Sequence, residues 1–148
     1  MKTEKISETF VRNLLRLLPD WHSKLVRPFK DRLNREMSLE TYYCLQTLRT
    51  RGTVTMTELA GELRVPKQQV TKLVDKLYDH RFVERVSSDK DRRMIRILLT
   101  PLAEAYLDEY YLKNTVFIKN LEEQLTDSEI AEINDAVEVL GRILPKLK

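Results

Sequence analysis

The sequence predicts a mainly α-helical chain that carries one small β-hairpin and forms a single domain over residues 1–148. Three observations support this fold class. Glycine is rare, with 3 in 148 residues, which suits a chain made mostly of helices. Apolar residues recur at spacings of three and four towards both ends of the chain, the period of an amphipathic helix. Between these ends, two short apolar runs flank a charged loop, the pattern of a β-hairpin.

Two short helices with a tight connection are predicted after residue 54. Thr55 and Glu58 are three residues apart, the spacing of a capping box that opens a helix. Pro66 lacks an N–H and disfavours helix at the residue before it, so this helix should end by about Val65. A second helix is predicted over residues 67–80, with a buried stripe formed by Val70, Leu73, Val74 and Leu77.

A hairpin follows these two helices. Residues 82–86 alternate apolar and polar side chains, and residues 94–99 form the apolar return strand. Residues 53–54 are predicted to be a short strand that pairs with the hairpin. The order helix, turn, helix, hairpin is that of a winged helix-turn-helix, an arrangement that binds nucleic acid. We call residues 38–100 the reader.

The second of the two short helices would be a recognition helix, whose N-terminal residues meet base edges in the major groove. Gln can pair with adenine, Lys with guanine or phosphate, and the Thr methyl group can contact the thymine methyl group. The hairpin tip would be a wing whose basic side chains enter a minor groove. The predicted DNA-binding residues are Thr55, Lys67, Gln68, Gln69, Thr71, Lys72, Lys90, Asp91, Arg92 and Arg93.

Charge is distributed unevenly along the chain. From Arg64 to Arg96 there are ten Lys/Arg and five Asp/Glu, a net charge of +5, whereas the whole chain carries +3, so the remainder carries −2. A positive reader on a slightly negative body is typical of a DNA-binding protein. The alternative is a winged-helix module that binds protein, without specific DNA binding, in which the polar helix face and the hairpin tip are ordinary solvated surfaces.

Several motifs of the reader agree in pattern and spacing with one known family: Thr55-x-x-Glu58-Leu59-Ala60, Val70-Thr71-x-Leu73-Val74-Asp75-x-Leu77, Val83-Glu84-Arg85, Asp91-Arg92-Arg93 and Leu99-Thr100. With these motifs, residues 48–102 resemble the MarR family of bacterial transcriptional regulators. The resemblance implies a repressor that binds an inverted-repeat operator in double-stranded DNA as a homodimer. It also implies that Arg93 enters the minor groove while Asp91 steadies it.

The chain departs from the family pattern at two places. Arg81 stands where the family often has Gly, and a left-handed turn at a non-Gly residue costs roughly 1 kcal/mol. Pro66 and Lys67 stand where the family often has a Ser or Asp cap at the start of the recognition helix.

The N-terminal part of the chain is predicted to hold two helices. The first covers residues 6–34, and Pro19 and Pro28 should kink or restart it. The second opens at Ser38 and ends at Gly52. Its buried side is predicted to be Leu39, Tyr42, Leu45 and Leu48, with Tyr43 as a further candidate.

The C-terminal part is predicted to hold two more helices. One long helix should run from Pro101 to about Gln124, and a capping box of Thr126 and Glu129 should open the last one. The apolar stripe of this last helix consists of Ile130, Ile133, Val137, Leu140, Leu144 and Leu147. A stripe this apolar is expected to pack against a partner. In the MarR family the first and last helices of two subunits interlock, so we expect residues 6–34 and 101–147, the dimerisation frame, to form a homodimer.

A small aromatic or anionic effector is the remaining partner that the resemblance implies. Trp21, His22, Tyr42 and Tyr43 are candidates to line its pocket, although aromatic residues at helical spacing are often plain core. Cys44 is the only cysteine, and its position differs from that of the first-helix cysteine in oxidant-sensing relatives. We therefore interpret it as a small buried hydrophobic residue.

Several classes of protein find no support in the sequence. A single cysteine permits no internal disulfide and favours the reducing cytoplasm. No signal peptide and no apolar run of about 18 residues is present, so we expect no membrane association. Motifs of nucleotide-binding and metalloprotease enzymes are lacking, and neither histidine has neighbours at metal-ligand spacing. We expect no enzymatic activity, no cofactor and no metal.

Overall fold

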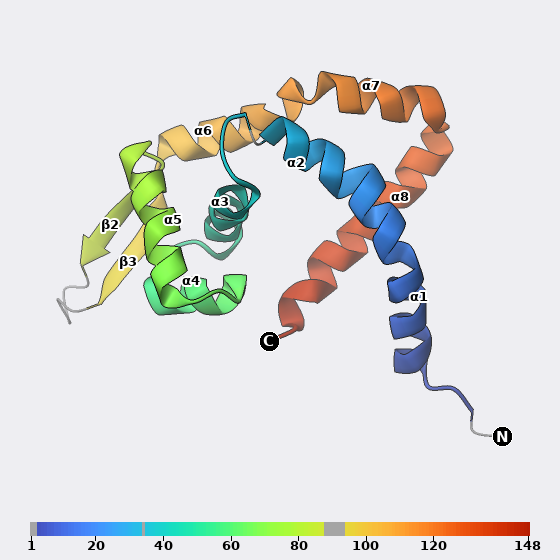
Figure 1. The fold of residues 1–148 in the computed structure, drawn as a ribbon, viewed down its shortest axis with the longest axis horizontal. Helices are drawn as coiled ribbons and strands as arrows, with labels where there is room; N and C mark the ends of the chain where they lie inside the picture. The colour runs from blue at the N-terminus through green and yellow to red at the C-terminus, as the bar shows by residue number, and fades with distance from the viewer. Residues whose placement is uncertain (1–2, 34, 88–93) are drawn as a thin grey trace. The chain divides into compact units, whose positions relative to one another are not determined.

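The computed structural model describes residues 3–33, 35–87 and 94–148. The chain divides into two compact units, residues 1–39 and 40–148. Helices make up most of both units, and the second unit contains a small antiparallel sheet (Figure 1). The predicted fold class, mainly α-helical with one small hairpin, is confirmed.

The first unit is a helical chain that changes its hydrogen-bonding pattern between two prolines. Helix α1 covers Ile6–Asp20 and contains Pro19, a π-helical segment covers Trp21–Val26, and α2 covers Arg27–Leu33. Pro28 has no N–H to donate to the carbonyl four residues back, and the Arg27 N–H donates to the carbonyl of His22, five residues back. The predicted irregularity near the prolines is confirmed, and it takes the form of a wider helical turn.

Helix α3 covers Leu39–Arg51 and ends as predicted at Gly52, which has a φ of +77°. Its buried side differs from the prediction. Leu45 and Leu48 are buried, but Leu39 and Tyr42 are only half-buried and Tyr43 is 46% exposed. The fully buried positions are Thr41, Cys44, Leu45 and Leu48. The predicted spacing of three residues drifts around a helix of 3.6 residues per turn, whereas this set keeps to one face.

The helix-turn-helix forms as predicted. Helix α4 covers Met56–Leu63, and α5 covers Lys67–Asp79. The capping box at the start of α4 is present: Glu58 N–H donates to Thr55 Oγ1 at 3.1 Å, and Thr55 N–H donates to Glu58 Oε2 at 3.2 Å. The whole predicted stripe of α5 is buried: Val70, Leu73, Val74 and Leu77. Burying four aliphatic side chains stabilises the reader by roughly 1.5–3 kcal/mol each.

The sheet has three strands in the order β1-β3-β2. Strand β1 covers Val54–Thr55, β2 covers Val83–Ser87 and β3 covers Ile95–Leu99. The register of the hairpin places Val83 opposite Leu99, and β1 pairs Val54 with Ile97. Val54, Val83 and Ile97 are buried, so this face of the sheet packs on the core. The predicted strand beside the hairpin is confirmed, one residue later than expected.

Helix α5 ends in a left-handed turn at Arg81, which has a φ of +62°. Phe82 N–H donates to the Leu77 carbonyl at 2.9 Å, and Arg81 N–H donates to the Tyr78 carbonyl at 2.9 Å. These two bonds form a Schellman motif, which usually places Gly at the left-handed position. The exit at Arg81 is therefore left-handed without a glycine, which is the case in which a non-Gly residue costs roughly 1 kcal/mol.

Replacing Arg81 with Gly should therefore stabilise the protein. A side chain at left-handed φ costs about 1–2 kcal/mol, and the extra freedom of Gly in the unfolded chain returns about half of it. We expect the free energy of unfolding in urea to rise by about 0.5–1 kcal/mol at fixed protein concentration. Arg81→Ala is the matched control, because it removes the same charge but keeps the Cβ atom; an equal gain from both variants would contradict the backbone explanation.

The predicted long helix from Pro101 to Gln124 is wrong in one respect, because it is broken near its middle. Helix α6 covers Pro101–Tyr110, a 3₁₀ turn covers Tyr111–Lys113, and α7 covers Thr115–Gln124. Asn114 leaves the helical region, with φ −88° and ψ 36°, and its side-chain amide lies 3.5 Å from the Tyr110 carbonyl. Asn competes for backbone hydrogen bonds, and β-branched Thr115 and Val116 favour helix weakly.

Helix α8 covers Asp127–Ile143 and opens with the predicted capping box of Thr126 and Glu129. Hydrogen bonds from the Thr126 backbone N–H and hydroxyl lower the pKa of the Glu129 carboxyl. No residue of α8 is buried. Along the predicted stripe, Ile133 is 47% exposed, Val137 is 45% exposed and Leu147 is 70% exposed. The second unit therefore does not cover this apolar stripe.

Candidate nucleic-acid interface

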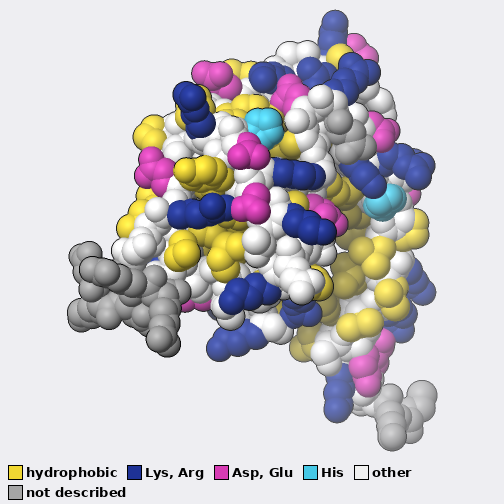
Figure 2. All heavy atoms as spheres, turned by 60° about the vertical axis from the view of Figure 1, so that its left-hand side comes forward, with side chains coloured by type: hydrophobic (Ala, Val, Ile, Leu, Met, Phe, Trp, Pro, Cys, Tyr) yellow, Lys and Arg dark blue, Asp and Glu magenta, His cyan; other side chains and the backbone are white. Residues whose placement is uncertain are grey.

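The outer face of α5 carries the polar residues predicted to contact bases. Gln68, Thr71 and Lys72 are exposed, on the side of the helix opposite the buried stripe. The Thr71 hydroxyl donates to the Lys67 carbonyl at 3.0 Å, so its methyl group is left for a contact. Figure 2 turns the side with α5 and the sheet towards the viewer, and lysine and arginine side chains are scattered over it, with acidic ones among them.

Gln69 stands apart from its neighbours on α5. It is half-buried, and its side-chain Nε2 donates to Glu40 Oε2 at 3.0 Å. Glu40 is an exposed residue in the first turn of α3. This contact could not be predicted from the sequence, because nothing in the spacing of two residues 29 positions apart indicates that they meet.

An ion pair connects helix α5 to strand β2 of the hairpin. Asp75 lies on the outer side of α5 near Lys72, and its carboxylate pairs with the Arg85 guanidinium of β2. The same guanidinium lies over the Tyr78 ring, 4.8 Å from the centroid. Asp75 would otherwise present a bare negative charge on this face, and the pairing with Arg85 offsets that charge.

The remaining predicted contact residues fall into two groups. Lys67 is exposed at the start of α5, and the Thr55 hydroxyl oxygen accepts the capping hydrogen bond of α4, which gives Thr55 a structural role. Lys90, Asp91, Arg92 and Arg93 lie outside the described residues. Their contacts with DNA stay predictions from the sequence.

Comparisons with known proteins identify the family to which the chain belongs. A model of the MarR family matches residues 37–95. Two relatives from Bacillus subtilis (strain 168) are named uncharacterized HTH-type transcriptional regulators. YsmB is 36% identical over 87 residues, which cover 59% of this chain and 60% of YsmB. YpoP is 31% identical over 101 residues, which cover 68% of this chain and 72% of YpoP. The chain belongs to the MarR family.

The fold of this MarR-family protein agrees with solved structures along nearly its whole length. Streptococcus pneumoniae FabT in complex with DNA is 21% identical, with a TM-score of 0.62. The match covers 94% of this chain and 99% of FabT. At this identity the likeness shows the fold alone, and it confirms the winged helix-turn-helix predicted from residues 55–100.

The predicted effector residues of the MarR-family protein lie in different settings. Tyr42 is half-buried and packs on Tyr110, with ring centroids 5.5 Å apart. The centroids of the Tyr110 and Tyr106 rings lie 5.7 Å apart, and those of the Tyr106 and Phe82 rings lie 5.0 Å apart. The four rings form a row that runs from α3 across α6 to Phe82, just after the end of α5. Tyr43 faces solvent, and Trp21 and His22 belong to the first unit.

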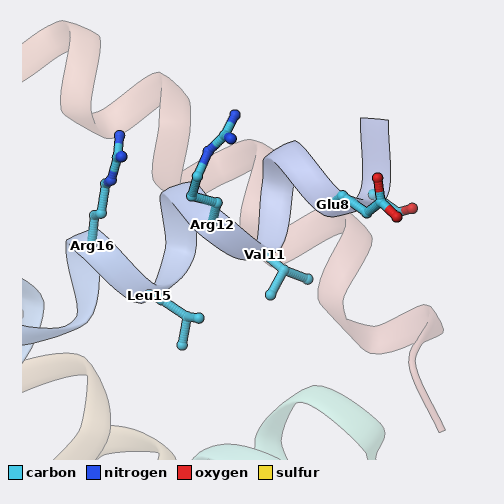
Figure 3. A pocket seen from close by; sticks show the side chains of 6 residues that line it. Glu8, Val11, Arg12, Leu15 and Arg16 are labelled. Atoms are coloured by element: carbon cyan, nitrogen blue, oxygen red, sulfur yellow. The ribbon is translucent and has the colours of Figure 1, made fainter. Parts of the chain in front are cut away.

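An open groove follows one face of α1, and none of the four predicted effector residues lines it. Its lining consists of Ser7, Glu8, Val11, Arg12, Leu15 and Arg16. Figure 3 shows Val11 and Leu15 on one side of α1 and the Arg12 and Arg16 side chains on the other. A groove on a single helix encloses no ligand, so the effector pocket stays a prediction.

Cys44 is buried within α3 with no exposed surface, as predicted for a small hydrophobic residue. Burial raises the pKa of its thiol from 9.0 to about 12. Above pH 9 the thiol ionises in the unfolded chain but stays protonated in the folded one, so rising pH favours unfolding.

The stability of the protein should therefore show a specific loss in alkali. Between about pH 8 and pH 10 the wild-type protein should lose about 1 kcal/mol more free energy of unfolding than Cys44→Ala. The difference between the two proteins removes the contributions of tyrosines and lysines that titrate in the same range. Parallel pH profiles for the two proteins would show that the folded thiol ionises as easily as the unfolded one.

The described residues contain no group of three or more His, Cys, Asp or Glu side chains placed to hold a metal ion. Within the same residues, no helix has the length and apolar character needed to cross a membrane.

Proposed function

We propose that this protein is a sequence-specific double-stranded DNA-binding regulator that acts as a homodimer on an inverted-repeat operator. The observation that carries the proposal is the outer face of α5, where Gln68, Thr71 and Lys72 are exposed directly opposite a buried stripe. A helix anchored by four buried aliphatic residues presents these side chains rigidly at its N-terminal end. That end is the part of a recognition helix that meets base edges.

Charge and family support the same proposal. The positive reader favours binding to phosphates, and the Asp75 carboxylate on this face is paired with Arg85. FabT, which shares the fold, is in complex with DNA. In the proposed complex the α5 residues contact the major groove, while the wing residues Lys90, Arg92 and Arg93 hold the minor groove and backbone.

The homodimer rests on apolar surface that the two units leave open. Neither α1 nor α8 contains a buried residue, although both carry an apolar stripe along much of their length. Exposed apolar surface on this scale marks an interface. A second copy of the chain is the proposed occupant, because two readers at a fixed spacing bind an operator far more tightly than one.

Repression and control by a small aromatic or anionic effector complete the proposal. The row of rings from Tyr42 to Phe82 joins α3 to the end of α5. A ligand that displaced Tyr42 would therefore disturb packing next to the recognition helix. The effector itself is proposed from the family resemblance, since the groove along α1 does not include Tyr42 in its lining.

The test is selection of bound sequences from pooled duplex DNA, followed by affinity measurements across a salt series. We expect an inverted repeat with half-sites about 10 base pairs apart, centre to centre. Affinity should fall about 10³–10⁵-fold between about 50 and 200 mM salt if about six to ten phosphates are neutralised. Binding without sequence enrichment and with little dependence on salt would favour the protein-interaction module instead.

A further inference from the structure

We propose that Glu40 is a positioning residue that sets the base preference of Gln69. This inference rests on the proposed function, because it assigns a role within DNA recognition. It starts from the contact between α3 and α5: the Gln69 side-chain amide donates to the Glu40 carboxylate at 3.0 Å. Gln69 is half-buried at the edge of the outer face of α5, while Gln68 beside it is exposed.

The chemistry of the pair fixes the orientation of the Gln69 amide. A carboxylate only accepts hydrogen bonds, so Gln69 must turn its NH₂ group towards Glu40 and cannot turn its oxygen there. One N–H is used in that bond. The amide keeps its oxygen as an acceptor and its second N–H as a donor. Adenine presents a donor and an acceptor side by side in the major groove, and a Gln amide in this state matches them.

The charge of Glu40 argues against a contact with Gln69 that has no function. Glu40 is exposed and lies beside the first turn of α5, the part of the reader that faces DNA in the proposed complex. A carboxylate at that place repels phosphates and lowers affinity for every sequence alike. The same charge raises specificity if it fixes the Gln69 amide, because specificity is a difference between affinities.

Replacing Glu40 with Gln separates orientation from charge and size. The variant Glu40→Gln keeps the shape of the side chain, but the new amide both donates and accepts hydrogen bonds. That amide at position 40 can donate to the Gln69 oxygen as well as accept from the Gln69 nitrogen. Gln69 would then adopt both amide orientations, and its preference for one base would weaken.

The experiment measures the affinities of wild type and Glu40→Gln for a selected operator, for all single-base variants of one half-site, and for non-specific duplex. The position read by Gln69 is identified with Gln69→Ala. At that position we expect Glu40→Gln to reduce the preference for the favoured base by about tenfold, the order of one bidentate pair. Affinity for non-specific duplex should rise about two- to fivefold, since a negative charge near phosphate is removed.

Two further variants make the result decisive. In the double variant that combines Glu40→Gln with Gln69→Ala, the effect of residue 40 on base preference should disappear, whereas its effect on non-specific affinity should remain. Glu123→Gln on α7 is the matched control: it removes one exposed carboxylate outside the reader and should change neither quantity. A structural role of Glu40 in α3 alone would lower affinity at all positions and leave the preference intact.

The outcomes distinguish the two proposals. Unchanged base preference in Glu40→Gln, with operator binding retained, would overturn the positioning role and leave the proposed function standing. A changed preference that persists in the Gln69→Ala background would also overturn it, because Glu40 would then act through another residue. Wild-type protein that selects no sequence from the duplex pool would overturn the proposed function and this inference with it.

Discussion

Placing two carboxylates on the apolar stripe of α8 should convert the proposed dimer into a monomer. The double variant Ile133→Asp with Val137→Asp puts both charges where a second copy is proposed to pack, and burying unpaired carboxylates is strongly unfavourable. At one and the same concentration, we expect sedimentation to show a dimer for the wild type and a monomer for the double variant. Operator affinity should fall about 10²–10⁴-fold, because the two half-sites are no longer bound by linked readers.

Ala131→Asp is the matched control for this variant. Ala131 is exposed on the side of α8 away from the stripe, so the same new charge should leave the dimer intact. Deleting residues 126–148 is the stronger form of the test and should abolish cooperative folding, since the apolar surfaces of the frame lose their cover. A truncated chain that stayed a soluble monomer and bound the palindrome tightly would show that the dimer is not needed.

The helix-turn-helix could be predicted from the sequence because its signals are local. The Thr55–Glu58 capping box, the break at Pro66 and the four-residue stripe of α5 each depend on residues within one or two turns. The left-handed exit at Arg81 could not be predicted in the same way, because the residue itself disfavours that conformation. Local signals of this kind agree with the tertiary packing in most foldable sequences.

Two elements were predicted less well, and the physical reasons differ. In α3 the buried face includes Thr41, a polar residue that a search for apolar spacing passes over. The break between α6 and α7 depends on Asn114, a residue that helices also tolerate in their interior. In α3 tertiary contacts decide which face of the helix is buried, and at Asn114 they decide whether the helix continues or breaks.

In the candidate site, too, the features that depend on local sequence could be predicted and those that depend on tertiary packing could not. That Gln68, Thr71 and Lys72 share an exposed face follows from helix periodicity, so the sequence alone indicated it. The contact of Glu40 with Gln69 and the pairing of Asp75 with Arg85 join different elements. Each depends on how those elements pack together, which a single sequence does not reveal.

Base contacts and minor-groove contacts should respond differently to the DNA that flanks an operator. Gln68→Ala should weaken operator binding by about 1–3 kcal/mol, or about 5–150-fold, with the loss concentrated at one base position and independent of the flanks. Arg93→Ala, in the wing outside the described residues, should weaken binding most when the flanks are A·T-rich. A narrow A·T minor groove concentrates the negative potential that attracts an arginine.

The measurement is the affinity of each variant for one operator placed between A·T-rich or G·C-rich flanks. Asp91→Ala should give a milder form of the Arg93→Ala defect, because its carboxylate is expected to orient the guanidinium without touching DNA. Equal losses on both flanks for Arg93→Ala would exclude its minor-groove role. Tighter binding by Asp91→Ala at low salt would identify Asp91 as a repulsive charge near phosphate, since removing a carboxylate that steadies Arg93 can only weaken the complex.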